Sequence, residues 1–233
     1  MGVAHIVIVE DTLPIAELVS DHLSDAGHRT EIIGDGREAA ERFRRDLPDV
    51  VVLDVMLPGQ DGLQVCEAIR ASDGTQPIVV MLTARQQEDD AMAGYRAGAD
   101  DYVRKPFGVQ ELVARIGALL ALAQRRQPAQ PAARDMGGLA LDVASRQVHV
   151  NGVELRLAPM EFDLLARLCR APGEVLDRAL LLEEVWGYEH AGYARTVDSH
   201  VTRLRRKLSN AQWSGAIATV HGVGYRLEPP GAG

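Results

Sequence analysis

Short runs of β-branched and apolar residues alternate with stretches of helical length in the first half of the chain, and this alternation restricts the fold more than any other feature. The runs at 4–9, 50–53 and 78–82 are apolar almost throughout, as expected of strands buried on both faces. Five such repeats predict an α/β unit with a five-stranded parallel sheet and helices on both faces. The predicted strands are Ala4–Val9, Arg29–Ile33, Val50–Leu53, Ile78–Leu82 and Asp101–Arg104, and the predicted helices are Ile15–Ala26, Gly36–Asp46, Gly62–Ala71, Asp89–Ala97 and Gln110–Leu122.

The second half follows a different, α+β pattern. Asn151-Gly152 is a strong hairpin signal between two strand-like runs, and the chain ends in two more runs around His221-Gly222-Val223. Three helices between these sheets predict a helix-turn-helix with a β wing. The strands are expected at Leu139–Asp142, Arg146–Val150, Val153–Leu157, Ile217–Val220 and Gly224–Leu227, and the helices at Met160–Cys169, Arg178–Trp186 and Thr196–Leu208.

The segment Gln124–Gly138 is rich in Gln, Ala, Pro and Gly and shows no periodicity, which is typical of a flexible linker. The predicted organisation is therefore a domain at 1–123, a linker at 124–138 and a second domain at 139–233. Residues 1–123 carry 21 acidic against 11 basic residues, whereas residues 139–233 carry 11 of each sign. The first domain would repel nucleic acid, so any DNA contact must come from the second.

Other sequence features exclude several classes. No apolar run approaches the 18 residues of a membrane span, and the start of the chain does not resemble a signal peptide. Cys66 and Cys169 are far apart, so no disulfide framework or CxxC metal site is available. We expect a cytoplasmic protein without membrane contact.

Reactive side chains follow four of the five predicted strands in the first domain. Glu10-Asp11 follow the first, Asp54 the third, Thr83 the fourth and Lys105 the fifth. These strands would be neighbours in the flavodoxin-like order, so the side chains should meet at one edge of the sheet. Each residue alone is more often a solvated loop residue, but together the carboxylates suit Mg²⁺ and Lys105 suits a phosphoryl group.

Four segments resemble the receiver domain of bacterial two-component response regulators: VIVED (Val7–Asp11), VVLDVMLPGQDG (Val51–Gly62), MLTAR (Met81–Arg85) and GADDYVRKPF (Gly98–Phe107). The resemblance implies that Asp54 accepts a phosphoryl group from a sensor histidine kinase. It implies that Mg²⁺ is held by Glu10, Asp11, Asp54 and the main-chain carbonyl of Met56. Thr83 and Lys105 would contact the phosphoryl oxygens, Tyr102 would turn inward on activation, and the Lys105-Pro106 bond would be cis.

The resemblance also implies a homodimer on activation, held by surface ion pairs. Asp101 and Arg115 match one such pair and Glu111 is present, but Ala91, Arg96 and Gly117 depart from the usual charges. Such a protein catalyses only its own phosphorylation and dephosphorylation. An aspartate-nucleophile phosphohydrolase, a receiver that signals without phosphorylation and a dinucleotide-binding module are the alternatives. The lack of a second carboxylate in Asp54-Val55-Met56 disfavours the phosphohydrolase. The intact acidic cluster disfavours the receiver that signals without phosphorylation, and the lack of a Gly-rich turn disfavours the dinucleotide-binding module.

The segment Arg195–Leu208 (RTVDSHVTRLRRKL) predicts an amphipathic helix whose apolar stripe faces the core. A solvated surface helix is the plainer reading, but the accompanying wing favours DNA recognition. The stripe consists of Val197, Val201, Leu204 and Leu208, and the opposite face would present Ser199, Thr202, Arg203 and Arg206, with His200 and Lys207 at its margins.

This helix, together with LAPMEFDLLARL (Leu157–Leu168), VLDRALLLEEVWG (Val175–Gly187) and TVHGVGYRL (Thr219–Leu227), resembles the winged-helix effector of the OmpR/PhoB subfamily. The resemblance implies binding to double-stranded promoter DNA, and the loop Gly187–Ala194 matches one that can meet RNA polymerase. Arg203 would be the main base-reading residue with Thr202 and Arg206 nearby, and Trp186, Arg195, His200 and Thr219 would contact phosphates.

Two departures affect this domain. At the tip of the wing, His221 replaces the usual Arg, so we expect a weaker DNA contact that strengthens toward pH 6. Ala158 replaces the usual Thr that caps the first helix, which should cost about 1 kcal/mol unless another group substitutes.

Overall fold

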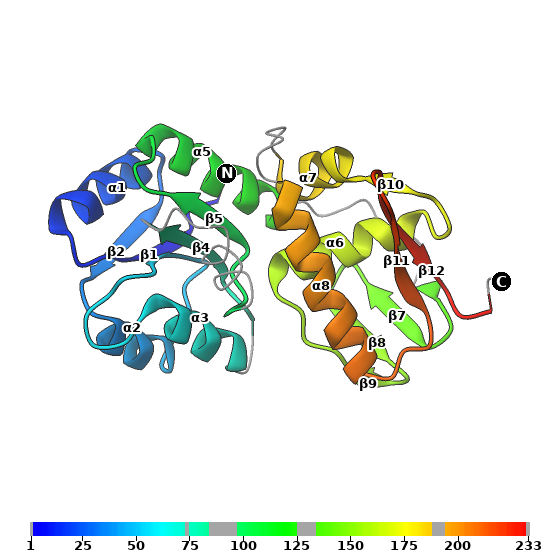
Figure 1. The fold of residues 1–233 in the computed structure, drawn as a ribbon. Helices are drawn as coiled ribbons and strands as arrows, with labels where there is room; N and C mark the ends of the chain where they lie inside the picture. The colour runs from blue at the N-terminus through cyan, green and yellow to red at the C-terminus, as the bar shows by residue number, and fades with distance from the viewer. Residues whose placement is uncertain (1, 73–74, 84–96, 125–133, 188–193, 232–233) are drawn as a thin grey trace. The chain divides into compact units, whose positions relative to one another are not determined.

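The computed structural model describes residues 2–72, 75–83, 97–124, 134–187 and 194–231 (Figure 1). The chain divides into two compact units, Met1–Ala121 and Leu122–Gly233, called here the N-terminal and C-terminal units. The predicted helix Asp89–Ala97, together with Ala91 and Arg96, falls almost wholly outside the described residues. The same is true of most of the loop 187–194.

The N-terminal unit is built on a five-stranded sheet in the order β2-β1-β3-β4-β5, all parallel, as predicted. The side chains of β3 and β4 are buried throughout, which explains why these runs are apolar on both faces. The strands are β1 (His5–Val9), β2 (Arg29–Ile33), β3 (Val50–Asp54), β4 (Ile78–Thr83) and β5 (Asp101–Arg104).

Helices cover both faces of this sheet. Figure 1 shows α1 and α5 on one face and α2 and α3 on the other. The side chains of Asp35 and Asp61 cap α2 and α3 by accepting backbone N–H bonds, so both helices begin at the residue after an aspartate. The helices are α1 (Leu13–Asp25), α2 (Gly36–Phe43), α3 (Gly62–Ala71) and α5 (Val109–Gln124).

The C-terminal unit begins with a four-stranded antiparallel sheet and ends with a three-stranded one. The first contains β6 (Arg134–Asp135), β7 (Leu139–Asp142), β8 (Gln147–Val150) and β9 (Val153–Glu154), and the second contains β10 (Leu176–Asp177), β11 (Ala216–Val220) and β12 (Gly224–Glu228). Between them lie α6 (Pro159–Arg170), α7 (Arg178–Trp186) and α8 (Ala194–Asn210), which pack against one another.

Two short strands were not expected from the sequence. β6 lies inside the segment expected to be linker and pairs with β7, and α5 extends to Gln124 at the other end of that segment. β10 pairs with β12 and adds the third strand to the wing sheet. Two-residue strands leave no periodic pattern, so only their pairing partners reveal them.

Candidate functional sites

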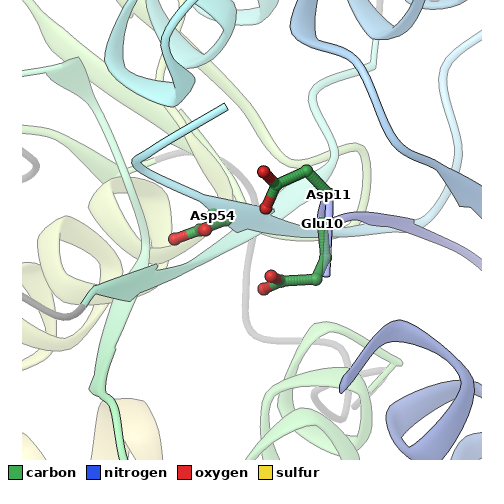
Figure 2. A group of neighbouring side chains, drawn as sticks. All are labelled: Glu10, Asp11 and Asp54. Atoms are coloured by element: carbon green, nitrogen blue, oxygen red, sulfur yellow. The ribbon is translucent and has the colours of Figure 1, made fainter. Parts of the chain in front are cut away.

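The carboxyl edge of the parallel sheet brings the predicted acidic residues together. Glu10 and Asp11 directly follow β1, and Asp54 ends the neighbouring β3. One carboxylate oxygen from each lies within 4.8 Å of the others. Figure 2 shows the three carboxylates on the same side of the strand ends. Glu10 and Asp54 are buried and Asp11 is exposed, so this acidic cluster has one carboxylate at the surface.

Lys105 supplies the positive charge at this cluster. Its Nζ donates to Glu10 Oε2 at 2.5 Å and to Asp54 Oδ2 at 3.1 Å, and its bond to Pro106 is cis, as predicted. Burial raises the pKa of Asp54 above its usual value, although Lys105 opposes that change. Burial would lower the pKa of Lys105, but its bonds to the two carboxylates outweigh this effect and raise it.

The other residues predicted for this site lie around it. Thr83 ends β4 and is completely buried, and its carbonyl accepts the Lys105 backbone N–H at 2.6 Å. Tyr102, on β5, is 4% exposed and belongs to the core. Met56 has an exposed side chain, and its backbone forms a hydrogen bond with Asp54. Oxygen donors at this density fit a small hard cation such as Mg²⁺.

The predicted dimer residues form one ion-pair group within the chain. Arg115 is 6% exposed, donates to Asp101 Oδ2 at 3.4 Å and to Glu111 Oε1 at 2.8 Å, and Asp101 is completely buried. In the single chain Asp101 and Arg115 therefore pair with each other below the surface, and their part in a dimer stays a prediction. Burial of Arg115 between β5 and α5 leaves only Glu111 exposed.

In the C-terminal unit, the apolar stripe of α8 faces the core as predicted, but the opposite face differs from the prediction. Thr202 and Arg206 are exposed, whereas Arg203 is only 5% exposed and donates from Nε to Glu161 Oε1 at 2.8 Å. Ser199 is also 5% exposed. A carboxylate on α6 therefore holds Arg203 inside the protein, and its role as the main base-reading residue stays a prediction.

Trp186 and His200 are also buried rather than exposed. Their rings meet edge to face with centroids 4.8 Å apart, and Thr196 O accepts a hydrogen bond from His200 Nδ1 at 2.8 Å. Both rings therefore serve the packing of α7 against α8, and their contacts with phosphates stay a prediction.

The wing residues remain accessible. Thr219 is half-buried on β11 and accepts from Arg205 of α8 at 2.7 Å, and His221 is exposed in the turn before β12. The side chain of Arg195 lies outside the described residues, although its backbone belongs to α8.

The expected cost in stability of Ala158 at the start of α6 is partly offset, because Glu161 accepts the Ala158 backbone N–H at 3.0 Å.

Sequence reasoning missed Glu161, which is 2% exposed at its side chain. Besides Arg203 and Ala158, it binds Lys207 Nζ at 2.6 Å. Burial alone would raise the pKa of Glu161, but Arg203 and Lys207 lower it to about 2. A signal was present: positions 161, 164, 165 and 168 have the spacing of one helical face, which places Glu161 in an otherwise apolar stripe.

Both units match known protein families. Residues 6–117 match the response regulator receiver domain, and residues 152–227 match the C-terminal domain of transcriptional regulatory proteins. The DNA-binding response regulator MtrA of Mycolicibacterium smegmatis is 43% identical over 227 residues, which cover 97% of each chain.

Among solved structures, a cysteine-to-serine variant of RitR matches with a TM-score of 0.79 and 26% identity, covering 97% of this chain and 99% of the other. DrrB, an OmpR/PhoB homologue from Thermotoga maritima, matches with a TM-score of 0.50 and 31% identity, covering 97% of this chain and 100% of the other. Within the described residues, no helix combines the length and hydropathy needed to cross a membrane. With its receiver fold, acidic cluster and helix-turn-helix unit, the chain belongs to the OmpR/PhoB family of two-component response regulators, which are transcription regulators.

Proposed function

We propose that Asp54 is the phosphoacceptor and that its phosphorylation by a sensor histidine kinase controls DNA binding by the C-terminal unit. The observation that carries this proposal is the convergence at the edge of the sheet of three carboxylates, Asp54 among them, and of the Lys105 ammonium, which donates a hydrogen bond to Asp54. In this chemistry an Asp54 oxygen attacks the phosphorus of a phosphohistidine in line. The new O–P bond forms as the P–N bond breaks, and the imidazole leaves.

The residues around Asp54 fit defined roles. Glu10, Asp11, Asp54 and the main-chain carbonyl of Met56 would hold Mg²⁺, which supplies positive charge for the phosphoryl oxygens. Lys105 supplies a second positive charge, since its Nζ contacts both Glu10 and Asp54. Thr83 offers its hydroxyl, and a shift of Thr83 toward the phosphoryl group would change the packing around Tyr102.

Acetyl phosphate tests the phosphorylation step. With Mg²⁺, the wild-type chain should gain one phosphoryl group, detected as a mass increase, and Asp54→Ala should gain none. Asp61→Asn is a matched control, because Asp61 caps α3 and is not part of the acidic cluster. Continuous phosphate release from monoesters would instead support a phosphohydrolase.

For DNA binding, Thr202 and Arg206 of α8 are the side chains best placed to reach the major groove, with Thr219 and His221 on the wing. Arg206→Ala should relax base preference and reduce the salt dependence of affinity by about one phosphate contact. His221→Ala should lower affinity for promoter DNA, because this exposed side chain lies in the turn of the wing. An unchanged affinity would contradict this role.

The remaining partners follow from the proposed regulation. A phosphorylated chain would form a homodimer on promoter DNA, to which Glu111 contributes its exposed carboxylate. The loop 187–194 would meet RNA polymerase. Sedimentation with and without acetyl phosphate tests the dimer, and a constant monomer mass after full phosphorylation would contradict it.

A further inference from the structure

The carboxylate of Glu161 joins two helices inside the C-terminal unit. Its Oε1 accepts from Arg203 Nε at 2.8 Å, and its Oε2 accepts from Lys207 Nζ at 2.6 Å and from the Ala158 backbone N–H at 3.0 Å. Lys207 also donates to Arg156 O at 3.1 Å. Glu161 is thus a buried anion on α6 that binds two cations of α8.

These contacts occupy one flank of α8. Positions 200, 203 and 207 have the spacing of one helical side, which lies between the apolar stripe and the exposed positions 202, 206 and 209. Of these three residues, Arg203 and Lys207 form ion pairs with Glu161. On this flank the rotation of α8 about its own axis is therefore fixed by hydrogen bonds with defined directions, in addition to packing.

The opposite flank of α8 is held separately. Asp198 accepts from Arg178 Nε at 2.7 Å and from the Tyr225 hydroxyl at 2.6 Å, and Arg205 donates to Ile217 O at 2.8 Å. These bonds connect α8 to α7 and to the wing sheet. With both flanks held, a narrow exposed strip containing Thr202 and Arg206 remains for the groove.

We propose that Glu161 is a positioning residue for DNA recognition: by holding Arg203 and Lys207 against α6, it sets the rotation of α8 and keeps these two cations away from phosphates. This inference rests on the proposed reading of DNA by α8. Base preference depends on how side chains line up with base edges, whereas non-specific affinity depends on the number of available cations. Loss of the Glu161 charge should therefore lower base preference and raise non-specific affinity.

The test uses the full chain, a duplex selected by the wild type from random sequences, and a scrambled duplex of the same composition. For Glu161→Gln we expect the affinity ratio between the two duplexes to fall about tenfold or more. Binding to the scrambled duplex should become more salt-dependent, by one to two phosphate contacts, because Arg203 and Lys207 are released. An unchanged affinity ratio would overturn the inference.

Asp163→Asn is the matched control. Asp163 lies on the same helix and binds Arg146, a residue outside α8, through both oxygens, at 2.8 and 3.0 Å. It should lose stability but keep the wild-type affinity ratio and salt slope. If both variants lose base preference equally, Glu161 acts only on stability and the inference is overturned.

A double variant separates positioning from base reading and guards against failed folding. Glu161→Gln with Arg203→Met removes the buried anion and the cation that faces it, which avoids an uncompensated buried charge. Positioning predicts that the double variant recovers stability relative to Glu161→Gln but keeps a lowered affinity ratio, because the hydrogen bonds that set the rotation of α8 are absent from both variants. A wild-type affinity ratio in the double variant would overturn the inference. If the double variant binds both duplexes alike while Glu161→Gln retains preference, Arg203 reads bases and the inference is overturned. If the wild type selects no duplex, the proposed DNA reading itself fails.

Discussion

At the scale of single residues, Lys105 would compete with the divalent cation that the acidic cluster of the N-terminal unit would hold. The Lys105 ammonium binds Glu10 and Asp54 oxygens that would also ligate a divalent ion. In the proposed mechanism it would therefore be both the partner of the phosphoryl group and a competitor of the metal. Its place at the end of β5 makes this double role possible, because β5 lies beyond β4 and approaches the cluster from the far side.

Replacing Lys105 by Met should tighten Mg²⁺ binding to the free protein by about tenfold, which corresponds to ~1.4 kcal/mol. The reason is that the carboxylates lose a charge-assisted competitor. Titration calorimetry measures the affinity, and acetyl phosphate labelling should fall in the same variant. Lys207→Met, which removes the other lysine of the chain, should leave the Mg²⁺ affinity unchanged. Weaker binding in Lys105→Met would contradict the competition.

Glu161 makes the stability of the C-terminal unit depend on pH. Its pKa of about 2 in the folded protein lies below its ordinary value of 4.5. The ionised form therefore stabilises the fold above pH 4.5, and this contribution, on the order of 3 kcal/mol, is lost as pH falls toward 2. The difference in free energy of unfolding between wild type and Glu161→Gln should shrink over this range. Trp186 and Trp213 are the two tryptophans, so fluorescence during urea unfolding reports on this unit. A constant difference from pH 6 to pH 3 would contradict the assignment.

At the scale of elements, close backbone contacts fix the loop between β3 and α3. Gly62 begins α3, and a Cβ at this position would lie 2.0 Å from Asp54 O. Gly36, at the start of α2, approaches the same loop, since its N–H donates to Pro58 O at 3.0 Å. The loop that carries Met56 is thus held at its end by Gly62 and in its middle by Gly36, two positions without a side chain.

Gly62→Ala should therefore displace this loop and lower the free energy of unfolding by roughly 1–3 kcal/mol, the usual cost of overpacking. Urea denaturation followed by circular dichroism measures the loss, and phosphorylation by acetyl phosphate should slow. Gly117→Ala is the matched control, since its Cβ would meet nothing within 4 Å inside α5. That substitution should raise stability by up to about 1 kcal/mol. Equal destabilisation by both would refute the close-contact explanation.

At the scale of the whole molecule, the two compact units carry separate cores and separate sites. The acidic cluster belongs to the N-terminal unit, whereas both tryptophans belong to the C-terminal unit. Ligand binding to one unit should stabilise that unit by mass action and leave the other unchanged unless the two unfold together.

We expect Mg²⁺ at 100 times its Kd to stabilise the N-terminal unit by about 2.7 kcal/mol. The transition followed by circular dichroism should gain a second, later phase, while the transition followed by tryptophan fluorescence stays in place. Asp54→Ala should reduce the Mg²⁺ effect. A parallel shift of the fluorescence transition would show that the two units unfold as one.

The sequence alone determined the two-domain architecture, the parallel sheet order and the family. These depend on periodicity, on turn signals and on motifs such as VVLD (Val51–Asp54), which are local along the chain. It also predicted the meeting of Glu10, Asp11, Asp54 and Lys105, because the order of parallel strands places their carboxyl ends at one edge.

The tertiary structure alone decided which charged side chains are available to a partner. Arg203 and Arg206 are both arginines of α8. Arg203 is held by the buried carboxylate of Glu161, 42 positions away in sequence, whereas Arg206 is exposed. Arg115 is likewise held within the chain, because it donates hydrogen bonds to Asp101 and Glu111. Helical periodicity places a residue on a face of its own helix, but the neighbouring helix or strand that covers this face depends on packing between distant segments.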